Sequence, residues 1–96
     1  MKINTQIVLK DLAGKEIKDP DGKGFTLGQA LSNIVVADKA EGKMKLYVLG
    51  TKLYQDKMVE VDEADLNLIK SIVKKTEAYG ALVAGQCEVI LEEIKK

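Results

Sequence analysis

The spacing of apolar residues changes once along the chain, and this change sets the fold class. Over residues 3–9 apolar side chains recur at every second position, which predicts a half-buried β-strand. Residues 11–15, with Gly14 free to adopt positive φ, predict a turn, and residues 16–18 return as a short second strand. From residue 26 onward the spacing becomes helical. We therefore expect an α+β fold, an N-terminal β-hairpin packed on about four α-helices, in a single small domain over residues 1–96.

Several helix ends are marked by side chains that can satisfy unpaired backbone groups. Thr26 and Gln29 have the spacing of a capping box, which predicts that the first helix begins at Thr26. Asp62, followed by Glu63 and Asp65, predicts another helix start, because acidic groups stabilise the positive end of the helix dipole. The three later helices are expected over residues 43–54, 63–75 and 78–94. No internal repeat and no interdomain linker are expected.

The second helix has apolar residues around much of its circumference. Met44, Tyr47 and Val48 share one side with Tyr54, and three leucines widen this apolar side. This pattern predicts a helix that is buried on most of its faces. The two tyrosines are seven residues apart, and their apolar rings with polar tips suit a core or an interface.

The last helix has a flank of small residues beside its apolar stripe. Gly85 in a helix interior costs about 1 kcal/mol relative to alanine, so close approach of another element would explain its presence. Whether that element belongs to the same chain or to another subunit stays open. Our hypothesis is that this flank contributes to a subunit or partner contact. The predicted interface residues are Tyr79, Ala81, Ala84 and Gly85.

The charge pattern argues against nucleic acid as the main partner. The 15 basic and 15 acidic side chains balance, and every basic residue is lysine, which lacks the planar fork of arginine for phosphate or guanine. A neutral protein is also prone to self-association, so a homo-oligomer or a protein partner is expected. The alternative is a small regulator that contacts nucleic acid through lysines of the second helix region. These lysines are Lys39, Lys43, Lys45 and Lys52.

Two glycine-containing patterns near the first helix fall short of known ligand-binding motifs. Residues 19–24 place acids and glycine as in a calcium loop, but Lys23 and Ala30 stand where the loop needs ligands. Gly22, Gly24 and Gly28 are spaced one residue too widely for a dinucleotide fingerprint. We interpret this segment as a solvated turn that leads into a capped helix.

No arrangement of side chains indicates catalysis. The chain contains no histidine, so Cys87 has no general base of the usual kind, and its place on an apolar stripe predicts a buried thiol. The acids around residues 60–65 are accounted for by helix capping. The sequence therefore predicts a protein that is not an enzyme, with no catalytic residue, no cofactor, no metal site and no small-molecule substrate.

The location expected from the sequence is the cytoplasm. Residues 1–6 lack the apolar stretch of a signal peptide, and no apolar run approaches the roughly 20 residues of a membrane span. A single cysteine cannot form an internal disulfide. No membrane association is expected.

Four stretches carry a resemblance to a group of small proteins. They are residues 19–28, with the Asp-Pro-Asp-Gly-Lys-Gly loop before Phe-Thr-Leu-Gly, and residues 45–54, 59–66 and 81–86. In these stretches the chain resembles small uncharacterised proteins encoded by phages and prophages. The resemblance implies a viral or prophage context in a bacterial host and carries no activity. Together with the residues, it leads us to expect a non-enzymatic accessory or interaction protein that self-associates.

Overall fold

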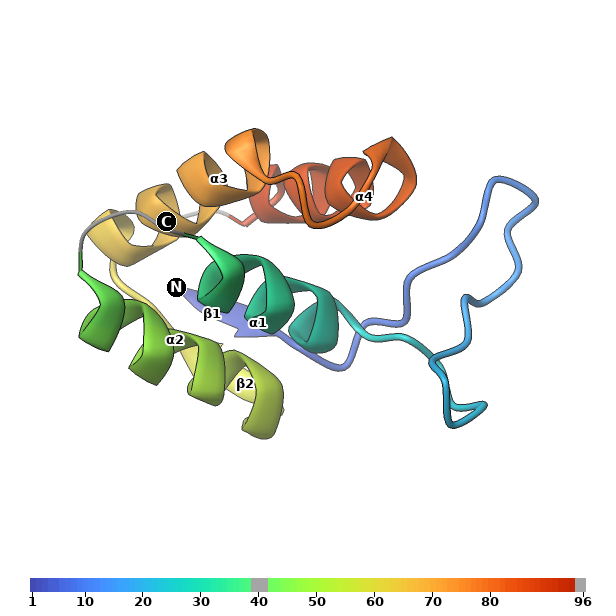
Figure 1. Ribbon diagram of the computed structural model, residues 1–96, viewed down its shortest axis with the longest axis horizontal. Coiled ribbons are helices and arrows are strands. Elements are labelled where there is room, and N and C mark those ends of the chain that lie inside the picture. Colours follow the sequence, from blue (N-terminus) through green and yellow to red (C-terminus); the bar gives the residue numbers. More distant parts are fainter. Residues whose placement is uncertain (39–41, 95–96) are drawn as a thin grey trace.

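The fold consists of two short strands and four helices in the part of the chain that is described. The computed structural model describes residues 1–38 and 42–94 (Figure 1). The elements are β1 (Lys2–Asn4), α1 (Leu27–Ala37), α2 (Lys43–Gln55), β2 (Met58–Glu60), α3 (Glu63–Lys75) and α4 (Ala81–Glu92). The expected α+β class, with an antiparallel pair of strands that includes the N-terminal segment and four helices, is confirmed.

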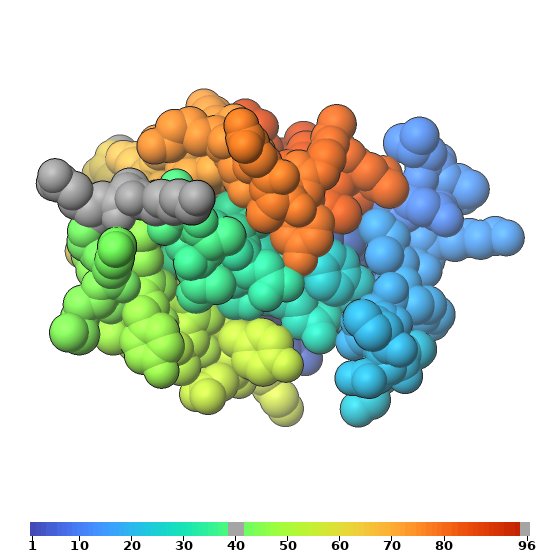
Figure 2. All heavy atoms as spheres, in the orientation of Figure 1, coloured from blue at the N-terminus to red at the C-terminus, as the bar shows by residue number. Residues whose placement is uncertain are grey.

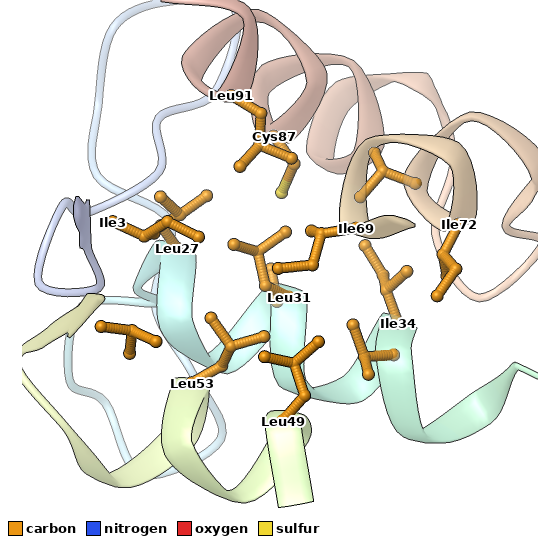
Figure 3. Close-up of a cluster of buried hydrophobic side chains, with 14 of the residues drawn as sticks. Ile3, Leu27, Leu31, Ile34, Leu49, Leu53, Ile69, Ile72, Cys87 and Leu91 are labelled. Carbon is orange, nitrogen blue, oxygen red and sulfur yellow. The ribbon is translucent and has the colours of Figure 1, made fainter. Parts of the chain in front are cut away.

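Helix α1 lies at the centre of the fold. It packs against α2 on one side and against α3 and α4 on the other (Figure 1). The core fills the space between these helices with apolar side chains that are almost fully buried (Figure 3). Among them are Ile3, Leu27, Leu31, Ile34, Leu49, Leu53, Ile69, Ile72, Cys87 and Leu91. Because α1 lies between α2 and α4, the sides of α2 and α4 that face away from α1 lie on opposite sides of the molecule (Figure 1).

Strand β1 pairs with β2, nearly sixty residues later, and not with residues 16–18 as the sequence predicted. In the antiparallel register Ile3 lies opposite Val59, and both side chains are buried. The predicted strand over residues 3–9 stops at Asn4, whose side-chain oxygen accepts a hydrogen bond from the Gln6 backbone N–H and turns the chain. The Thr5 hydroxyl then donates to backbone carbonyls next to β2, which fixes this turn to the sheet.

Residues 9–24 form an octapeptide repeat, contrary to the expectation of no repeat. The two copies, 9–16 and 17–24, share lysine, aspartate, glycine and lysine at their second, third, sixth and seventh positions. The Leu9 N–H donates to Phe25, the Ile17 N–H to Leu9 and the Phe25 N–H to Ile17, over 2.9, 2.9 and 2.7 Å. These backbone bonds close a ring between three short extended segments. The predicted return of the chain at residues 16–18 is part of this ring, through the bridge from Lys10 to Glu16.

Each repeat contains the same turn, and an aspartate organises it. The Asp19 carboxylate accepts hydrogen bonds from the backbone N–H groups of Asp21 and Lys23, over 3.0 and 2.9 Å. Asp11 makes the equivalent bonds one repeat earlier. The sixth residue of each copy is a glycine, Gly14 in the first and Gly22 in the second. Gly22 has φ of 82°, a left-handed conformation that glycine adopts without strain. Residues 19–24 thus form the predicted turn.

Two of the helices begin where their capping residues predicted. Thr26 and Gln29 form both hydrogen bonds of the capping box, and the Asp62 side chain accepts from the Asp65 N–H over 2.7 Å. Helix α4 begins at residue 81, after the expected position, because residues 76–80 take a bend in which the Ala78 N–H donates to the Thr76 hydroxyl. Local capping chemistry therefore places the starts of α1 and α3.

Small residues lie between α1 and α2. A Cβ atom added at Gly28 would lie 2.5 Å from the Leu53 carbonyl oxygen, and one at Gly50 would lie 2.5 Å from Val36 Cγ1. Ser32 is buried at the same contact and donates to the Gln29 carbonyl. This is the close helix contact within the chain. The glycine that the sequence singled out for such a contact, Gly85, has no atom within 4 Å of its added Cβ.

Candidate interaction surfaces

The acids over residues 60–65 have structural partners. Asp62 caps α3, and the Asp65 carboxylate lies 2.9 Å from the Lys45 ammonium group. Hydrogen bonding and attraction to Asp65 raise the pKa of Lys45. Glu60 lies 3.1 Å from the Met1 amino group. Across residues 1–38 and 42–94, no group of three or more potential metal-ligating side chains is clustered.

Cys87 is buried among the core residues of α4. Burial raises the pKa of its thiol to about 12. A thiol in this state is protonated near neutral pH and is a poor nucleophile. None of the helices in the described ranges combines the length and hydrophobicity needed to cross a membrane.

An exposed apolar stripe covers the outer side of α2. Met44, Tyr47 and Tyr54 are 79, 68 and 64% exposed, and Val48 is also exposed. The expectation that these residues make α2 buried on most of its circumference is therefore wrong. Buried Leu46, Leu49, Gly50 and Leu53 face α1 and the core, so the sequence carries two apolar stripes on one helix. We call the exposed one the α2 face, consisting of Met44, Tyr47, Val48, Thr51 and Tyr54.

The α2 face is hollowed where it meets α1. A shallow groove runs along this junction, with Tyr47 and Tyr54 from α2 and Val36 from α1 at its walls. Gly50 lines the same groove, and its lack of a side chain lets Val36 pack directly on the α2 backbone. Val36 is itself exposed, which extends the apolar surface from α2 onto α1. In Figure 2 the two helices lie side by side on the visible surface, α1 in teal and α2 in green to yellow-green.

The lysines of the second helix region differ in whether they have a partner within the chain. Lys43 and Lys52 are exposed, whereas Lys45 is engaged with Asp65. Lys39, the fourth lysine of the nucleic-acid alternative, lies outside the described residues. Helix α2 contains three lysines and no acidic residue, and the ion pair with Asp65 neutralises one of these charges, so the positive charge lies near its two ends, at Lys43 and Lys52.

A second apolar groove lies on the outer side of α4. It is lined by Leu12, Ala81, Leu82, Gly85, Gln86, Val89 and Ile90. Leu12 is 96% exposed at the tip of the first octapeptide turn, and Val89 is 59% exposed. The Gln86 side chain fixes this turn beside α4, because its oxygen accepts from the Lys10 N–H over 2.9 Å and its nitrogen donates to the Lys10 carbonyl. We call this surface the α4 groove.

The four predicted interface residues do not share one surface. Ala81 and Gly85 line the α4 groove. Ala84 is half-buried on the neighbouring side of the helix. Tyr79 packs against its own chain: its ring centre lies 5.8 Å from that of Phe25, and its hydroxyl accepts a hydrogen bond from Asn33.

Sequence reasoning missed two contributors to these surfaces. Leu12 could have been found from the octapeptide repeat, which places it within a turn, and the structure leaves it 96% exposed. The α2 face could also have been found from the sequence. A helix at the surface needs only one apolar stripe to pack against the core, and α2 has two, so one of them is left exposed.

Compared with known proteins, the chain matches no family model, and neither curated proteins nor solved structures show significant similarity to it.

Proposed function

We propose that this chain is a non-enzymatic accessory or interaction protein and that the α2 face is its main binding surface. One observation carries the proposal: Met44, Tyr47 and Tyr54 expose most of their side chains along one side of a single helix. Contiguous apolar patches of this kind are uncommon on monomeric proteins and typically mark interaction sites. Tyrosine and methionine are also enriched in the cores of protein interfaces.

The chemistry of the α2 face favours a protein partner. Tyr47 and Tyr54 lie seven residues apart, about two helical turns, and each combines a large apolar ring with a hydroxyl that can form hydrogen bonds at a wet interface. The groove between them supplies a recess of the size that side chains of a partner helix or loop can occupy. Asp62 caps α3 and Asp65 pairs with Lys45, which supports a structural role for these two acids and a binding role for the surface.

The cellular setting belongs to the same proposal. The resemblance to small phage and prophage proteins supports a role in a bacterial host, and the protonated, buried Cys87 is compatible with its cytoplasm. In this setting the protein acts by assembling with copies of itself or with another protein.

Site-specific photocrosslinking tests the proposal. A photoreactive phenylalanine analogue replaces Tyr47, and in a matched control it replaces Asp21, which is exposed at the tip of the second octapeptide turn. Both proteins are irradiated in pure form and in extract of the native host. We expect adducts, to self or to another protein, from position 47 and not from position 21. Absence of adducts from position 47 in both settings would overturn the proposal.

A second candidate function follows from the positive charge of α2. Exposed Lys43 and Lys52 could contact the phosphate backbone of nucleic acid, as expected for a small regulator. This candidate predicts a mobility shift of generic duplex DNA at about 50 mM salt that weakens steeply as salt rises. Replacement of Lys43 and Lys52 by glutamine should abolish the shift. No shift of the unmodified protein would exclude this candidate.

A further inference from the structure

We infer that the peptide link between Asp21 and Gly22 is a site of isoaspartate formation, and that Asp19 controls how fast isoaspartate forms there. Isoaspartate is an aspartate that is joined to the next residue through its side-chain carboxyl carbon in place of its main-chain carbonyl carbon. The site lies in the second octapeptide turn, away from the α2 face and the α4 groove, and its chemistry needs only water.

The sequence and the exposure of the turn single out this one link. Asp21 is the only aspartate of the chain that is followed by glycine, and no asparagine is followed by glycine. Glycine at the second position matters because it has no side chain to hinder the approach of its nitrogen to the carboxyl group. Both residues are exposed, and a Cβ atom added at Gly22 would meet no atom within 4 Å. The reacting groups thus lie at the open surface of the turn, where backbone order is lowest.

The reaction has two steps and leaves the mass of the chain unchanged. In the first step the Gly22 nitrogen forms a bond to the side-chain carboxyl carbon of Asp21 and loses its proton, and one carboxyl oxygen leaves as water. The product is a cyclic succinimide, which a second water molecule opens. Water that adds at the side-chain carbon breaks its bond to nitrogen and restores Asp21. Water that adds at the main-chain carbon breaks the other bond to nitrogen and yields isoaspartate.

The folded turn holds back the first step. The Gly22 N–H donates to the Asp19 carbonyl oxygen over 3.0 Å, so the nitrogen is not free to turn towards the Asp21 carboxyl group. The Asp19 carboxylate strengthens the same turn, because it accepts from the backbone N–H groups of Asp21 and Lys23. The turn therefore has to open before the ring can close, and the rate follows the fraction of molecules in which it is open.

Asp19 is held in place by α1. Its second carboxylate oxygen accepts a hydrogen bond from the Gln29 amide over 3.3 Å, and Gln29 belongs to the capping box at the start of α1. The Asp19 backbone N–H also closes the turn, by donating to the Lys23 carbonyl over 2.7 Å. Isoaspartate at position 21 adds one carbon atom to the main chain between these bonds. We expect this extra atom to displace Gly22 and Lys23 from Asp19 and to leave the turn open.

The octapeptide repeat supplies an internal control. The first copy has the same turn, organised by Asp11, and its glycine, Gly14, has φ of 84°. Ala13 stands at the position of Asp21, so the first turn has no carboxyl group at the position that reacts. The variant Ala13→Asp should give the first turn a second site of the same kind. Ala13 is exposed, so the fold should be retained.

Incubation of the full chain over weeks near neutral pH, followed by peptide mapping, tests the inference. Mass spectrometry with electron-transfer fragmentation distinguishes isoaspartate from aspartate, and circular dichroism checks that each variant is folded. We expect isoaspartate at position 21 of the unmodified protein. Asp19→Ala removes the carboxylate acceptor and should accelerate its formation by up to about tenfold. The matched control, Asp11→Ala, should leave the rate at position 21 unchanged.

The variant Ala13→Asp extends the test to the first turn. It should form isoaspartate at positions 13 and 21. Adding Asp11→Ala to it should accelerate the reaction at position 13 alone. In urea that unfolds the chain, the unmodified protein and Asp19→Ala should react at the same rate, because no turn is left to open.

Two kinds of result would contradict the inference. Absence of isoaspartate at position 21 in the folded, unmodified protein would overturn the site. Equal rates for this protein and Asp19→Ala in the folded state, or a difference that persists in urea, would overturn the role of Asp19. Neither result bears on the adducts expected from position 47, so the proposed function is tested separately.

Discussion

The backbone of Gly28 in α1 lies directly against the carbonyl oxygen of Leu53 in α2, where an added Cβ would be 2.5 Å away. The same Cβ would lie 2.7 Å from that of Thr5. A methyl group at Gly28 thus forces backbone apart in two places. We expect Gly28→Ala to destabilise the fold by about 1–3 kcal/mol or more, as overpacking of a core does. Urea unfolding followed by circular dichroism measures this change.

The matched control for this prediction is Gly85→Ala on α4. An added Cβ at Gly85 meets no atom within 4 Å, so only helix propensity changes. In dilute, monomeric protein this variant should be more stable by up to about 1 kcal/mol. Equal destabilisation by both substitutions would contradict the placement of the close contact at Gly28.

The thiol of Cys87 should report unfolding. Burial raises its pKa to about 12, so the reactive thiolate is scarce near neutral pH and reagent has no access to it. We expect a water-soluble disulfide reagent to modify Cys87 only at the rate at which the fold opens, and urea should accelerate the reaction. The Val89→Cys variant, on the exposed side of the same helix, should gain one thiol that reacts at once. Rapid modification of Cys87 itself in the native protein would disprove its burial.

Asp19 should make the stability of the turn over residues 19–23 depend on pH. The hydrogen bond from the Lys23 backbone N–H lowers the pKa of the Asp19 carboxyl below 3.8, against a smaller opposing effect of desolvation, and the Gln29 amide adds to the lowering. Because the folded pKa lies below the unfolded one, the stabilisation is present above pH 3.8 and is lost as pH falls through the folded pKa. The carboxyl resonance in a pH titration by NMR measures that pKa directly.

The variant Asp19→Asn tests the same prediction through stability. Its urea midpoint should lie below that of the unmodified protein near neutral pH, and the difference should shrink as Asp19 becomes protonated. A difference between the two proteins that grows on acidification would have the wrong sign.

Gln86 should control the mobility of the first octapeptide turn. Its side chain makes two hydrogen bonds with the backbone of Lys10, and these hold Leu12 beside α4. We expect Gln86→Ala to speed amide hydrogen exchange at Lys10 several-fold, with little change in the core amides. Gln86→Glu keeps an acceptor for the Lys10 N–H but loses the donor to the Lys10 carbonyl, so it should restore protection only in part. The exposed Asn67→Ala on α3 serves as a control and should leave Lys10 unchanged.

The elements that the sequence predicted well are those with local causes. The Thr26 and Asp62 caps act within one helical turn, so the starts of α1 and α3 can be read from neighbouring residues. The partner of β1 could not be read this way. Val59 lies opposite Ile3 because the core brings distant segments together, and three-residue strands carry too little pattern to reveal it.

The candidate surfaces were harder to predict for a different physical reason. Periodicity shows that a helix side is apolar, and it does not show which apolar side meets the core. On α2 the side with Leu49 and Leu53 is buried and the side with Tyr47 is exposed, although both satisfy helical spacing. Close packing was expected at Gly85, where an added Cβ meets no atom within 4 Å, and close helix contacts are instead found at Gly28 and Gly50.

The pairing of β1 with β2 also determines when the fold can be completed on the ribosome. Residues 2–4 are synthesised before α1 and α2, yet their partners, residues 58–60, follow both helices along the chain and emerge after them. Until then Ile3 has no strand to pair with, and its burial waits on the second half of the chain. A strand that is made before α1 and α2 thus reaches its native pairing only after both helices have been made.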